Sequence, residues 1–382
     1  MKICYIGWAG NAIIRRWAKW FADNGHEIHI ISPHEPISEI SDELKKLHIH
    51  NLDIDNSVLN LKILPYKSSW LPIYPSRKII KEINPDIVHA YDVVYFGLPT
   101  VFSGNYPKIV SLMGSLCLAL NQPEVSVIYK LLIKFVAKRV DRIHSFSDNL
   151  TDELALFGVN KKKIITITPA VDTKNFNLDT DNYQIKRSLG LEDNSIIISI
   201  RNLAPWYNIG CLVNAIPFVV NKIAGAKFII KMGHIIHKDH ENEIKNLAEE
   251  LGVSDRVKFI SYVKYDDLPK YLACADVYVS TSLLDGLGIS NVEALACGTP
   301  AVLADIDSTR NLIKKGLYAR LYPPKDSKAL AKEIIASIKN SEKENKEIHK
   351  ENFKIIKEHY DFDKNMEKIE QLYEDLIKKH KK

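Results

Sequence analysis

The chain has few cysteines, no long apolar run and little net charge. Its five cysteines are scattered over 382 residues and form no Cys-x-x-Cys pair, which argues against a disulfide framework or a zinc ribbon and favours reduced thiols in the cytoplasm. The net charge of +5 is far from the basic excess of nucleic-acid binders. No apolar run approaches the ~20 residues of a membrane-spanning helix. Residues 1–7 already read as a buried strand, so we expect no signal peptide.

The chain also lacks the short motifs that mark several enzyme classes. No P-loop, Gly-x-Ser-x-Gly or His-Glu-x-x-His pattern occurs. The turn from Gly7 to Gly10 does not complete the Gly-x-Gly-x-x-Gly fingerprint of a dinucleotide site. His234, His237 and His240 show no metal-ligand spacing with a nearby acid. We therefore expect no cofactor and no metal ion.

Apolar strands and amphipathic helices alternate along the chain in two series. The first series is predicted to open with a strand at residues 2–6, a glycine-bearing turn, and a helix at residues 12–24 whose apolar face includes Trp17 and Trp20. Further strands of this series are expected at residues 26–31, 86–89, 108–112, 142–146 and 163–168. This alternation is the βαβ rhythm of a doubly wound parallel sheet.

The same rhythm restarts in the second half of the chain. Its strands are expected at residues 195–200, 227–231, 257–261, 277–280 and 301–304, with helices at 209–222, 241–251, 267–274 and 290–297. The polar segment 171–191 separates the two series, and we expect the hinge there. The tail beyond residue 341 carries apolar residues at helical spacing, which predicts closing helices. The sequence therefore predicts an α/β protein of two Rossmann-like domains.

The most informative segment runs from Ser280 to Pro300. A buried strand ends there, two glycines let the backbone approach a ligand closely, and a helix opens with Ser290 or Asn291 as its cap. Backbone amides at such a helix start form a diphosphate site without a metal. We expect Glu293 in the first turn, where its carboxylate can accept both hydroxyls of a ribose, and Asp285 as an acceptor for sugar hydroxyls. The alternative is a plain strand–loop–helix turn whose acid only complements the helix dipole.

At this point the sequence resembles a known family, the retaining glycosyltransferases of family four, which have the GT-B architecture. Asp285 and Glu293 are similar to the family's paired-acid motif, with aspartate in the first position where glutamate is usual. The segments at residues 293–302 and 321–326 also resemble family sequence. Earlier in the chain, residues 24–30, 84–90 and 165–176 resemble it in the family's order, although Ala170 stands where glycine is common.

The resemblance implies a GT-B fold, in which two Rossmann-like doubly wound domains face each other across a cleft. It places the acceptor-side domain at residues 1–174, completed by a C-terminal helix at 362–382 that crosses back to it, and the donor-side domain at 175–361. It implies transfer of a sugar from a nucleotide-sugar donor to a glycan, lipid-linked or small-molecule acceptor, with retention of the anomeric configuration. Basic groups, with no metal, would take the charge of the departing diphosphate.

For the donor side the resemblance points to three loops. The expected donor-binding residues are Gly7, Gly10, Asn202, Tyr207, Gly286, Leu287, Gly288, Ile289, Ser290 and Glu293, and the expected catalytic residues are Asp285, Glu293 and Arg201. Relatives usually carry an arginine and a lysine where Asn202 and Tyr207 align. Arg201, one residue early at the end of a buried strand, is therefore expected to supply the positive charge; otherwise the diphosphate is held more weakly. For Gly10, a tight turn and a substrate contact both stay open.

The expected acceptor-side residues are Asn11, His89, Tyr91, Asp92, Met113, Gly114 and Ser115. His89 follows a strand end, where it can line the acceptor cleft or serve as a structural residue. The loop that contains Met113 stands where relatives carry His-Gly or Trp-Gly-Ser-Asp, so it offers a backbone and a hydroxyl but no acid or base.

The lysines at 130, 134 and 138 form a stripe on a predicted helix whose apolar face includes Leu131 and Phe135. They form either a solvated face or a surface that rests on anionic lipid. We expect a cytoplasmic protein, at most peripheral at the inner face of the membrane, with no nucleic-acid partner. Two alternatives stay open: a nucleotide-sugar 2-epimerase, and a catalytically silent protein that binds sugar nucleotides or stabilises a partner.

Overall fold

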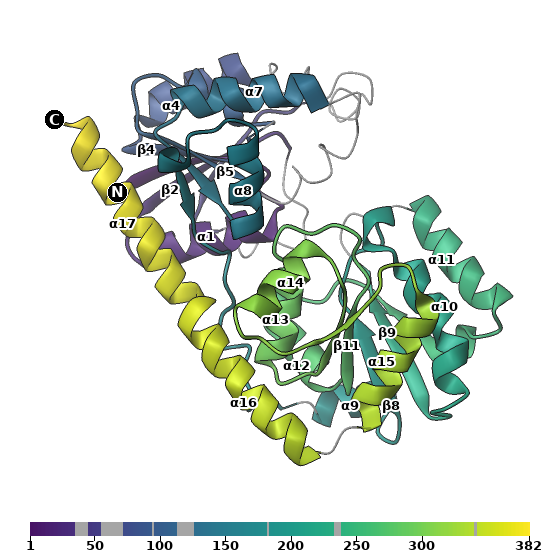
Figure 1. Ribbon diagram of the computed structural model, residues 1–382. Helices are drawn as coiled ribbons and strands as arrows, with labels where there is room; N and C mark the ends of the chain where they lie inside the picture. Colours follow the sequence, from purple (N-terminus) through teal and green to yellow (C-terminus); the bar gives the residue numbers. More distant parts are fainter. Residues whose placement is uncertain are drawn as a thin grey trace. The chain divides into compact units, whose positions relative to one another are not determined.

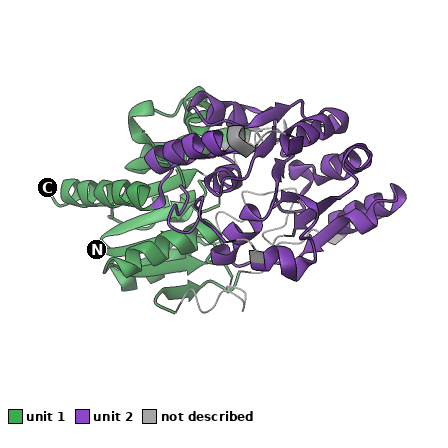
Figure 2. Cartoon of the chain, turned by 90° about the horizontal axis from the view of Figure 1, so that it is seen from below, with its two compact units in different colours: residues 1–169, 363–382 green, residues 170–362 purple. Residues whose placement is uncertain are grey.

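The computed structural model describes residues 1–34, 45–54, 72–93, 95–112, 126–181, 183–232, 238–339 and 342–382. The chain divides into two compact units, residues 1–169 with 363–382 (unit 1) and residues 170–362 (unit 2), as Figure 2 shows. Each unit has a parallel sheet of its own. The prediction of an α/β protein with two Rossmann-like domains is confirmed.

Unit 1 is built on a seven-stranded parallel sheet with the order β3-β2-β1-β4-β5-β6-β7. Its strands are β1 (Lys2–Ile6), β2 (Glu27–Ser32), β3 (His48–Asn51), β4 (Ile87–Tyr91), β5 (Lys108–Leu112), β6 (Arg142–Ser145) and β7 (Ile164–Thr166). Its helices are α1 (Ala12–Asp23), α4 (Ile73–Ile83), α5 (Gly97–Val101), α7 (Ser126–Arg139), α8 (Asp148–Leu156) and α17 (Phe362–His380). Helices α4 and α7 lie on one side of the sheet and α1 on the other (Figure 1). Strand β4 is buried along its whole length, including its polar His89.

Helix α1 starts because Asn11 caps it, its Oδ1 accepting from the backbone N–H of Ile13 and Ile14 at 2.9 and 3.3 Å. Trp17 is buried in the core as expected. Trp20 is only half-buried, because its indole N–H donates to Asp363 Oδ1 at 3.0 Å on α17. The expectation that Trp20 lies on the buried face of α1 is therefore wrong. The buried residues of the helix are Ile14, Arg15, Trp17, Ala18 and Phe21.

Helix α17 completes the core of unit 1, although it comes from the far end of the chain. Its Tyr373 is fully buried and stacks on Phe21 of α1, with ring centroids 5.2 Å apart and an interplanar angle of 14°. Glu370, one turn before, lies 2.7 Å from His26. The predicted return of the C-terminal helix to the first unit is confirmed.

Unit 2 has a six-stranded parallel sheet with the order β10-β9-β8-β11-β12-β13. Its strands are β8 (Ser195–Ser199), β9 (Ala226–Lys231), β10 (Val257–Ile260), β11 (Val277–Ser280), β12 (Ala301–Ala304) and β13 (Arg320–Tyr322). Its helices are α9 (Tyr183–Leu189), α10 (Ile209–Val220), α11 (Lys238–Glu250), α12 (Leu268–Ala273), α13 (Ile289–Ala296), α14 (Asp307–Lys314), α15 (Ser327–Lys339) and α16 (Glu342–His359).

The two faces of this sheet carry separate apolar clusters, and residue parity along each strand decides which cluster a side chain joins. On β8, Ile196 and Ile198 pack with the helices α12, α13 and α16. Ile197, between them, packs on the other face with α10, α11 and α15. Figure 1 shows these helix groups on either side of the strands. Because both faces are covered, functional groups are accessible at the strand ends and not along the strands.

The chain passes between the units twice, and the two passages are paired. The N–H of Val171 donates to the carbonyl of Tyr360 at 2.7 Å, and the N–H of Phe362 donates to the carbonyl of Val171 at 2.9 Å. Val171 and Asp361 form an isolated parallel bridge. The outgoing and returning segments therefore lie side by side. In the part of the chain that the structure describes, no helix has the length and apolarity to cross a lipid bilayer.

Candidate functional site

The site that the sequence analysis singled out lies at the carboxyl end of the unit 2 sheet, where the strand order reverses. Beside β8, the chain places β9 and β10 on one side and β11 to β13 on the other. In doubly wound sheets such a switch point is where ligands bind, because the loops on its two sides diverge. Arg201 follows β8, and Asp285 follows β11 in the next loop. Residues far apart in sequence therefore meet at this edge.

Arg201 contacts residues of both neighbouring segments. Its side chain is 8% exposed, and its Nη1 donates to Ser290 Oγ at 2.6 Å while its Nη2 lies 2.5 Å from Asp285 Oδ2. The guanidinium carbon lies 4.2 Å from the ring centroid of Tyr207, a cation–π contact. Its Nε is buried with no hydrogen-bond partner among the described residues. Burial alone would lower the pKa of Arg201, but the groups around it, led by the Asp285 carboxylate, together outweigh this effect, and the net shift is upward. The arginine is therefore permanently charged.

Helix α13 opens on Gly288, which corrects the expected cap. Gly288 has φ +70° and is the N-cap residue, and neither Ser290 nor Asn291 caps the helix with its side chain. Both side chains instead lie beside the phenol of Tyr278, whose hydroxyl is 3.1 Å from Ser290 Oγ and 3.0 Å from Asn291 Oδ1. A β-carbon on Gly288 would lie 2.5 Å from Asn291 Nδ2. Only glycine fits this backbone, which brings the first amides of α13 up to Arg201.

Glu293 is 4% exposed and belongs to the second turn of α13, so the expectation of a first-turn position is wrong. The reason is that α13 begins at Ile289, one residue before the expected start. The charge of Glu293 acts on Arg201 and also on Lys231, at the end of β9. Burial lowers the pKa of Lys231, and Glu293 opposes this shift. The sequence analysis missed Lys231, although a lysine that closes an apolar strand at the carboxyl edge is a detectable signal.

The remaining donor-side residues hold the two loops together. The carbonyl of Tyr207 accepts the hydroxyl of Thr281 at 2.7 Å, and Leu283 N–H donates to the carbonyl of Trp206 at 2.9 Å. The loops after β8 and β11 are therefore fixed to each other. Of the other expected residues, Gly286 is buried, Leu287 and Ile289 are half-buried and pack on the apolar cluster beneath, and Asn202 is exposed.

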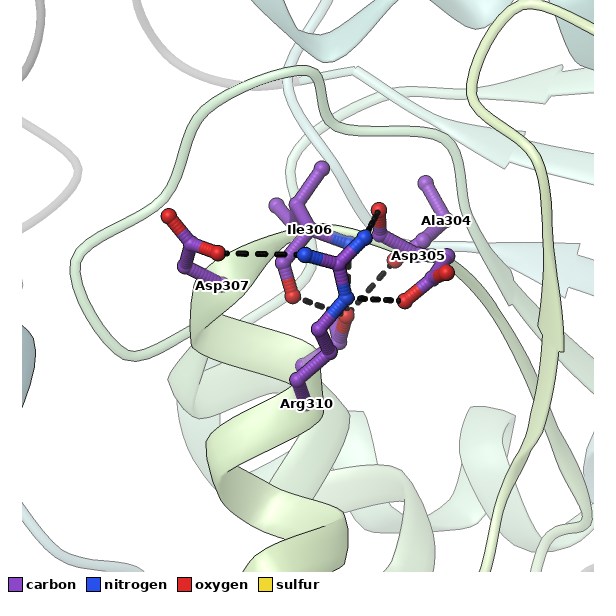
Figure 3. A network of polar contacts seen from close by, with 6 residues as sticks. Ala304, Asp305, Ile306, Asp307 and Arg310 are labelled. Carbon is purple, nitrogen blue, oxygen red and sulfur yellow. Dashed lines mark hydrogen bonds and ion pairs between the residues drawn. The ribbon is translucent and has the colours of Figure 1, made fainter.

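A third loop at the same edge, between β12 and α14, is held by its own polar network (Figure 3). Arg310 Nε lies 2.7 Å from Asp305 Oδ1, and Arg310 Nη1 lies 3.3 Å from Asp307 Oδ1. The hydroxyl of Thr309 donates to the carbonyl of Ala304 at 2.7 Å and accepts from the N–H of Ile306 at 3.1 Å. Arg310 is half exposed and pairs with two aspartates. Its positive charge is therefore neutralised within this loop.

In unit 1, the glycine turn after β1 is tightly packed. A β-carbon on Gly7 would lie 2.7 Å from Ile14 Cδ1, and one on Gly10 would lie 2.8 Å from the ring of Trp8. Asn11 serves as the cap of α1. Arg15, which sequence reasoning did not select, is 6% exposed and donates to the carbonyl of Gly10 at 2.5 Å. Packing accounts for both glycines.

The structure places His89 and Tyr91 in the interior of unit 1, both fully buried. His89 Nε2 lies 2.7 Å from Ser111 Oγ, which lies 2.8 Å from His144 Nδ1; the other ring nitrogen of His89 bonds the hydroxyl of Tyr373. Burial holds the pKa of His89 well below its usual value. Neither side chain can line an open cleft in this structure, because the strand carries it under α1 and α17.

Asp92, the next expected acceptor residue, is 6% exposed with φ +89°, and its Oδ1 accepts from the N–H of Tyr95 at 3.1 Å. Met113, Gly114 and Ser115 lie outside the described residues. Among the described residues, one group of metal-ligating side chains comes together, Glu27, His29 and His48 in unit 1.

Family models match most of the chain. Residues 181–379 match the family model of Glycosyl transferases group 1, and residues 11–175 match that of Glycosyltransferase Family 4. The N-acetyl-alpha-D-glucosaminyl L-malate synthase of Bacillus anthracis is 22% identical over 99% of this chain and 97% of its own. The UDP-Gal:alpha-D-GlcNAc-diphosphoundecaprenol alpha-1,3-galactosyltransferase of Escherichia coli is 23% identical over 83% and 82% of the two chains.

Among solved structures, the Anabaena protein HepE in complex with UDP-glucose superposes with a TM-score of 0.80 and 18% identity, over 98% of this chain and 100% of its own. At this identity the likeness shows the fold, which is GT-B.

Proposed function

Since the chain belongs to the glycosyl transferases group 1 and is a glycosyltransferase that uses a nucleotide-sugar donor, we propose that it transfers a hexosyl group with retention of the anomeric configuration and without a metal ion. The observation that supports the proposal is the buried Arg201, held by Asp285 and Ser290 at the switch point of the unit 2 sheet.

Breaking the bond between the sugar and the diphosphate leaves negative charge on the diphosphate. Arg201 and the start of α13 lie together at the edge where that group would sit. Lys231 adds a second positive charge near Glu293. Fixed positive groups in a largely buried site stabilise developing charge strongly, because they need no reorganisation. These positive groups would neutralise the leaving diphosphate, as a divalent cation does in metal-dependent enzymes. This supports metal-independent transfer.

The two acids would divide the donor between them. Glu293 is buried on α13, where a carboxylate can accept two neighbouring hydroxyls of a ribose. Asp285 lies on the loop before the helix and is engaged by Arg201 in the free protein. When a diphosphate takes over part of the arginine, Asp285 becomes available for a sugar hydroxyl. Donor binding and formation of the sugar subsite are therefore linked.

The acceptor is proposed to be a hydroxyl group of a glycan, lipid-linked sugar or small molecule. The Escherichia coli relative acts on a diphosphoundecaprenol-linked sugar and the Bacillus anthracis relative on malate, as their names state. Helix α7 favours contact with an anionic lipid surface. Val127 and Leu131 are each 62% exposed, beside the exposed Lys134 and Lys138. The expected apolar face was partly wrong, since Ile133 is buried in place of Leu131.

The proposal is tested by screening nucleotide sugars for thermal stabilisation and then measuring transfer. A donor at a hundred times its dissociation constant should stabilise the protein by about 2.7 kcal/mol. Release of the nucleoside diphosphate together with a glycosylated product of unchanged anomeric configuration supports the proposal. Binding without turnover over a broad acceptor panel supports the silent alternative, and interconversion of the donor sugar at C2 supports the epimerase.

A further inference from the structure

Four side chains that can bind a metal ion gather on one face of the unit 1 sheet, at its β3 edge. Glu27 and His29 are two residues apart on β2, and His48 and His50 are two residues apart on β3. Each pair therefore projects from one side of its strand. The parallel register sets His29 opposite His48. The ring of His29 stacks on those of His48 and His50, with centroids 4.7 and 5.3 Å apart.

The ligand atoms are close enough for one ion. Those of Glu27, His29 and His48 all lie within 4.8 Å of one another, and Glu27 Oε1 is 2.9 Å from His29 Nε2. Zinc binds imidazole nitrogen and carboxylate oxygen at about 2.0–2.2 Å, so its ligand atoms lie within about 4 Å of each other. A small rotation of the exposed Glu27 and His48 side chains reaches that spacing.

His29 is already oriented as a metal ligand. Its Nδ1 lies 3.0 Å from His50 Nε2, and its Nε2 points at Glu27. In the metal-free protein Nε2 donates to the Glu27 carboxylate; a metal ion bound at Nε2 takes the place of this proton and requires the tautomer in which Nδ1 donates to His50 Nε2. Ligating histidines in metal sites are commonly fixed by such a bond from the second ring nitrogen. His29 is 8% exposed, which holds the ring in place.

We propose that Glu27, His29 and His48 bind a divalent transition-metal ion, with His50 orienting His29 and a fourth position open to water. Imidazole ligands favour zinc, nickel or copper over magnesium or calcium. The ion would join the edge strand β3 to β2. Lys2 pairs with Glu27 in register, and their positions at the strand starts place the site at the amino end of the sheet, in a different unit from Arg201.

One cation already competes for the carboxylate. Lys2 Nζ lies 3.2 Å from Glu27 Oε1 and also donates to the carbonyl of Ile83 at 3.3 Å. A metal ion must displace or share this ammonium group. Replacing Lys2 by a neutral residue should therefore raise the affinity for the metal ion. If the stacked histidines only pack against one another and bind no metal, no such gain is expected.

The test is calorimetric titration of zinc chloride into the metal-stripped full chain. We expect one zinc per chain, and cobalt in its place should give tetrahedral d–d absorption without a thiolate charge-transfer band. E27Q and H48Q should each weaken binding at least about tenfold, and H50Q by about 10–100-fold. E243Q is the matched control, because the exposed Glu243 also pairs with a histidine, His240 on α11, at 2.8 Å; the zinc affinity of E243Q should equal that of wild type.

Absence of a stoichiometric site overturns the proposal, as does equal affinity of wild type, E27Q and H48Q. If those two variants fold poorly by circular dichroism, K2M decides, since unchanged or weaker zinc affinity in it contradicts the assignment. Glycosyl transfer by the stripped wild-type enzyme is measured in parallel. Its failure would bear on the proposed function and not on the zinc site, because the two readouts are independent.

Discussion

Arg201 and Asp285 are 84 residues apart in the chain, yet their side chains form a 2.5 Å ion pair in which the arginine is 8% and the aspartate 17% exposed. Two loops from opposite sides of the switch point create it. A buried pair of this kind is not strong evidence for stability, because its desolvation offsets much of its attraction. Under the proposed function, the pair holds a permanent positive charge where the diphosphate of the donor would bind, and the Nε–H of Arg201 has no partner among the described residues.

Replacing Arg201 by alanine should lower turnover by about 10²–10³, and by more than it weakens donor binding, because the charge it offsets grows as the glycosidic bond breaks. Initial rates and calorimetry measure the two quantities. Arg310→Ala is the control: Arg310 lies at the same sheet edge and is engaged by acids, but it is 51% exposed, so turnover should be nearly unchanged. Equal losses of binding and turnover in Arg201→Ala would make Arg201 a simple phosphate holder.

Glu293→Gln should weaken binding of the nucleoside diphosphate by one to two decades, since a lost charged hydrogen bond in a buried site costs about 1.5–3 kcal/mol. Calorimetry checks this. Glu333→Gln is a suitable control, because Glu333 is partly buried and paired at 3.2 Å with Arg320, the first residue of β13, whereas the site residues follow the carboxyl ends of their strands. Unchanged affinity in Glu293→Gln, with an intact fold, would show that the acid only complements the helix dipole.

Transfer should survive removal of divalent metal. A chelator added to the enzyme is expected to leave the initial rate unchanged, because Arg201, Lys231 and the start of α13 supply the positive charge. Loss of activity with the chelator, restored by magnesium or manganese, would show that these groups do not suffice.

Gly288→Ala should destabilise the protein more than Gly252→Ala. Both glycines have positive φ, +70° and +65°, so both substitutions meet the cost of about 1–2 kcal/mol for a left-handed residue. Only at Gly288 does the added methyl also meet Asn291 Nδ2, at 2.5 Å, whereas nothing lies within 4 Å at Gly252. Urea unfolding measures the difference, and donor affinity should fall in Gly288→Ala alone. Equal destabilisation would show that α13 shifts freely.

The buried histidines of unit 1 should make the protein acid-labile. Burial lowers the pKa of His144 to about 4 from 6.5. Between these values the unfolded chain takes up the proton and the folded chain does not, so stability is lost as the pH falls. From pH 7 to pH 5 the loss from His144 is about 2 kcal/mol. Urea unfolding at both pH values tests it: H144Q should reduce the loss, and H380Q, at an exposed position, should retain it.

The sequence predicted the frame of the fold well because buried parallel strands are short apolar runs. Strands 108–112, 277–280 and 301–304 have the predicted bounds. Strand β3 escaped notice, since its two histidines and asparagine do not look like a strand. Such a strand becomes recognisable only when β2 lies beside it, because pairing, not composition, defines it.

The candidate site could be proposed from the sequence residue by residue, but its contacts could not. The strand-to-helix turn and the family resemblance pointed to Arg201, Asp285 and Glu293, without showing that the first two form an ion pair. The start of α13 was misplaced because a serine is a common cap, whereas here the backbone of Gly288 turns left-handed. For His89 the sequence left a cleft-lining and a structural role open, and its complete burial beside Tyr373 of α17 supports the structural role.

The paired passages at Val171 and Tyr360 have an evolutionary consequence. Unit 2 is one uninterrupted stretch of sequence whose two ends are hydrogen-bonded to each other. Segments with adjacent ends can be inserted into a host domain, or removed from it, with little strain. Unit 2 can therefore be exchanged as a whole, as a cassette. A chimera that joins unit 1 to the corresponding stretch of another family member needs only two junctions at one place, which gives recombination a simple route to replacing unit 2 in one step.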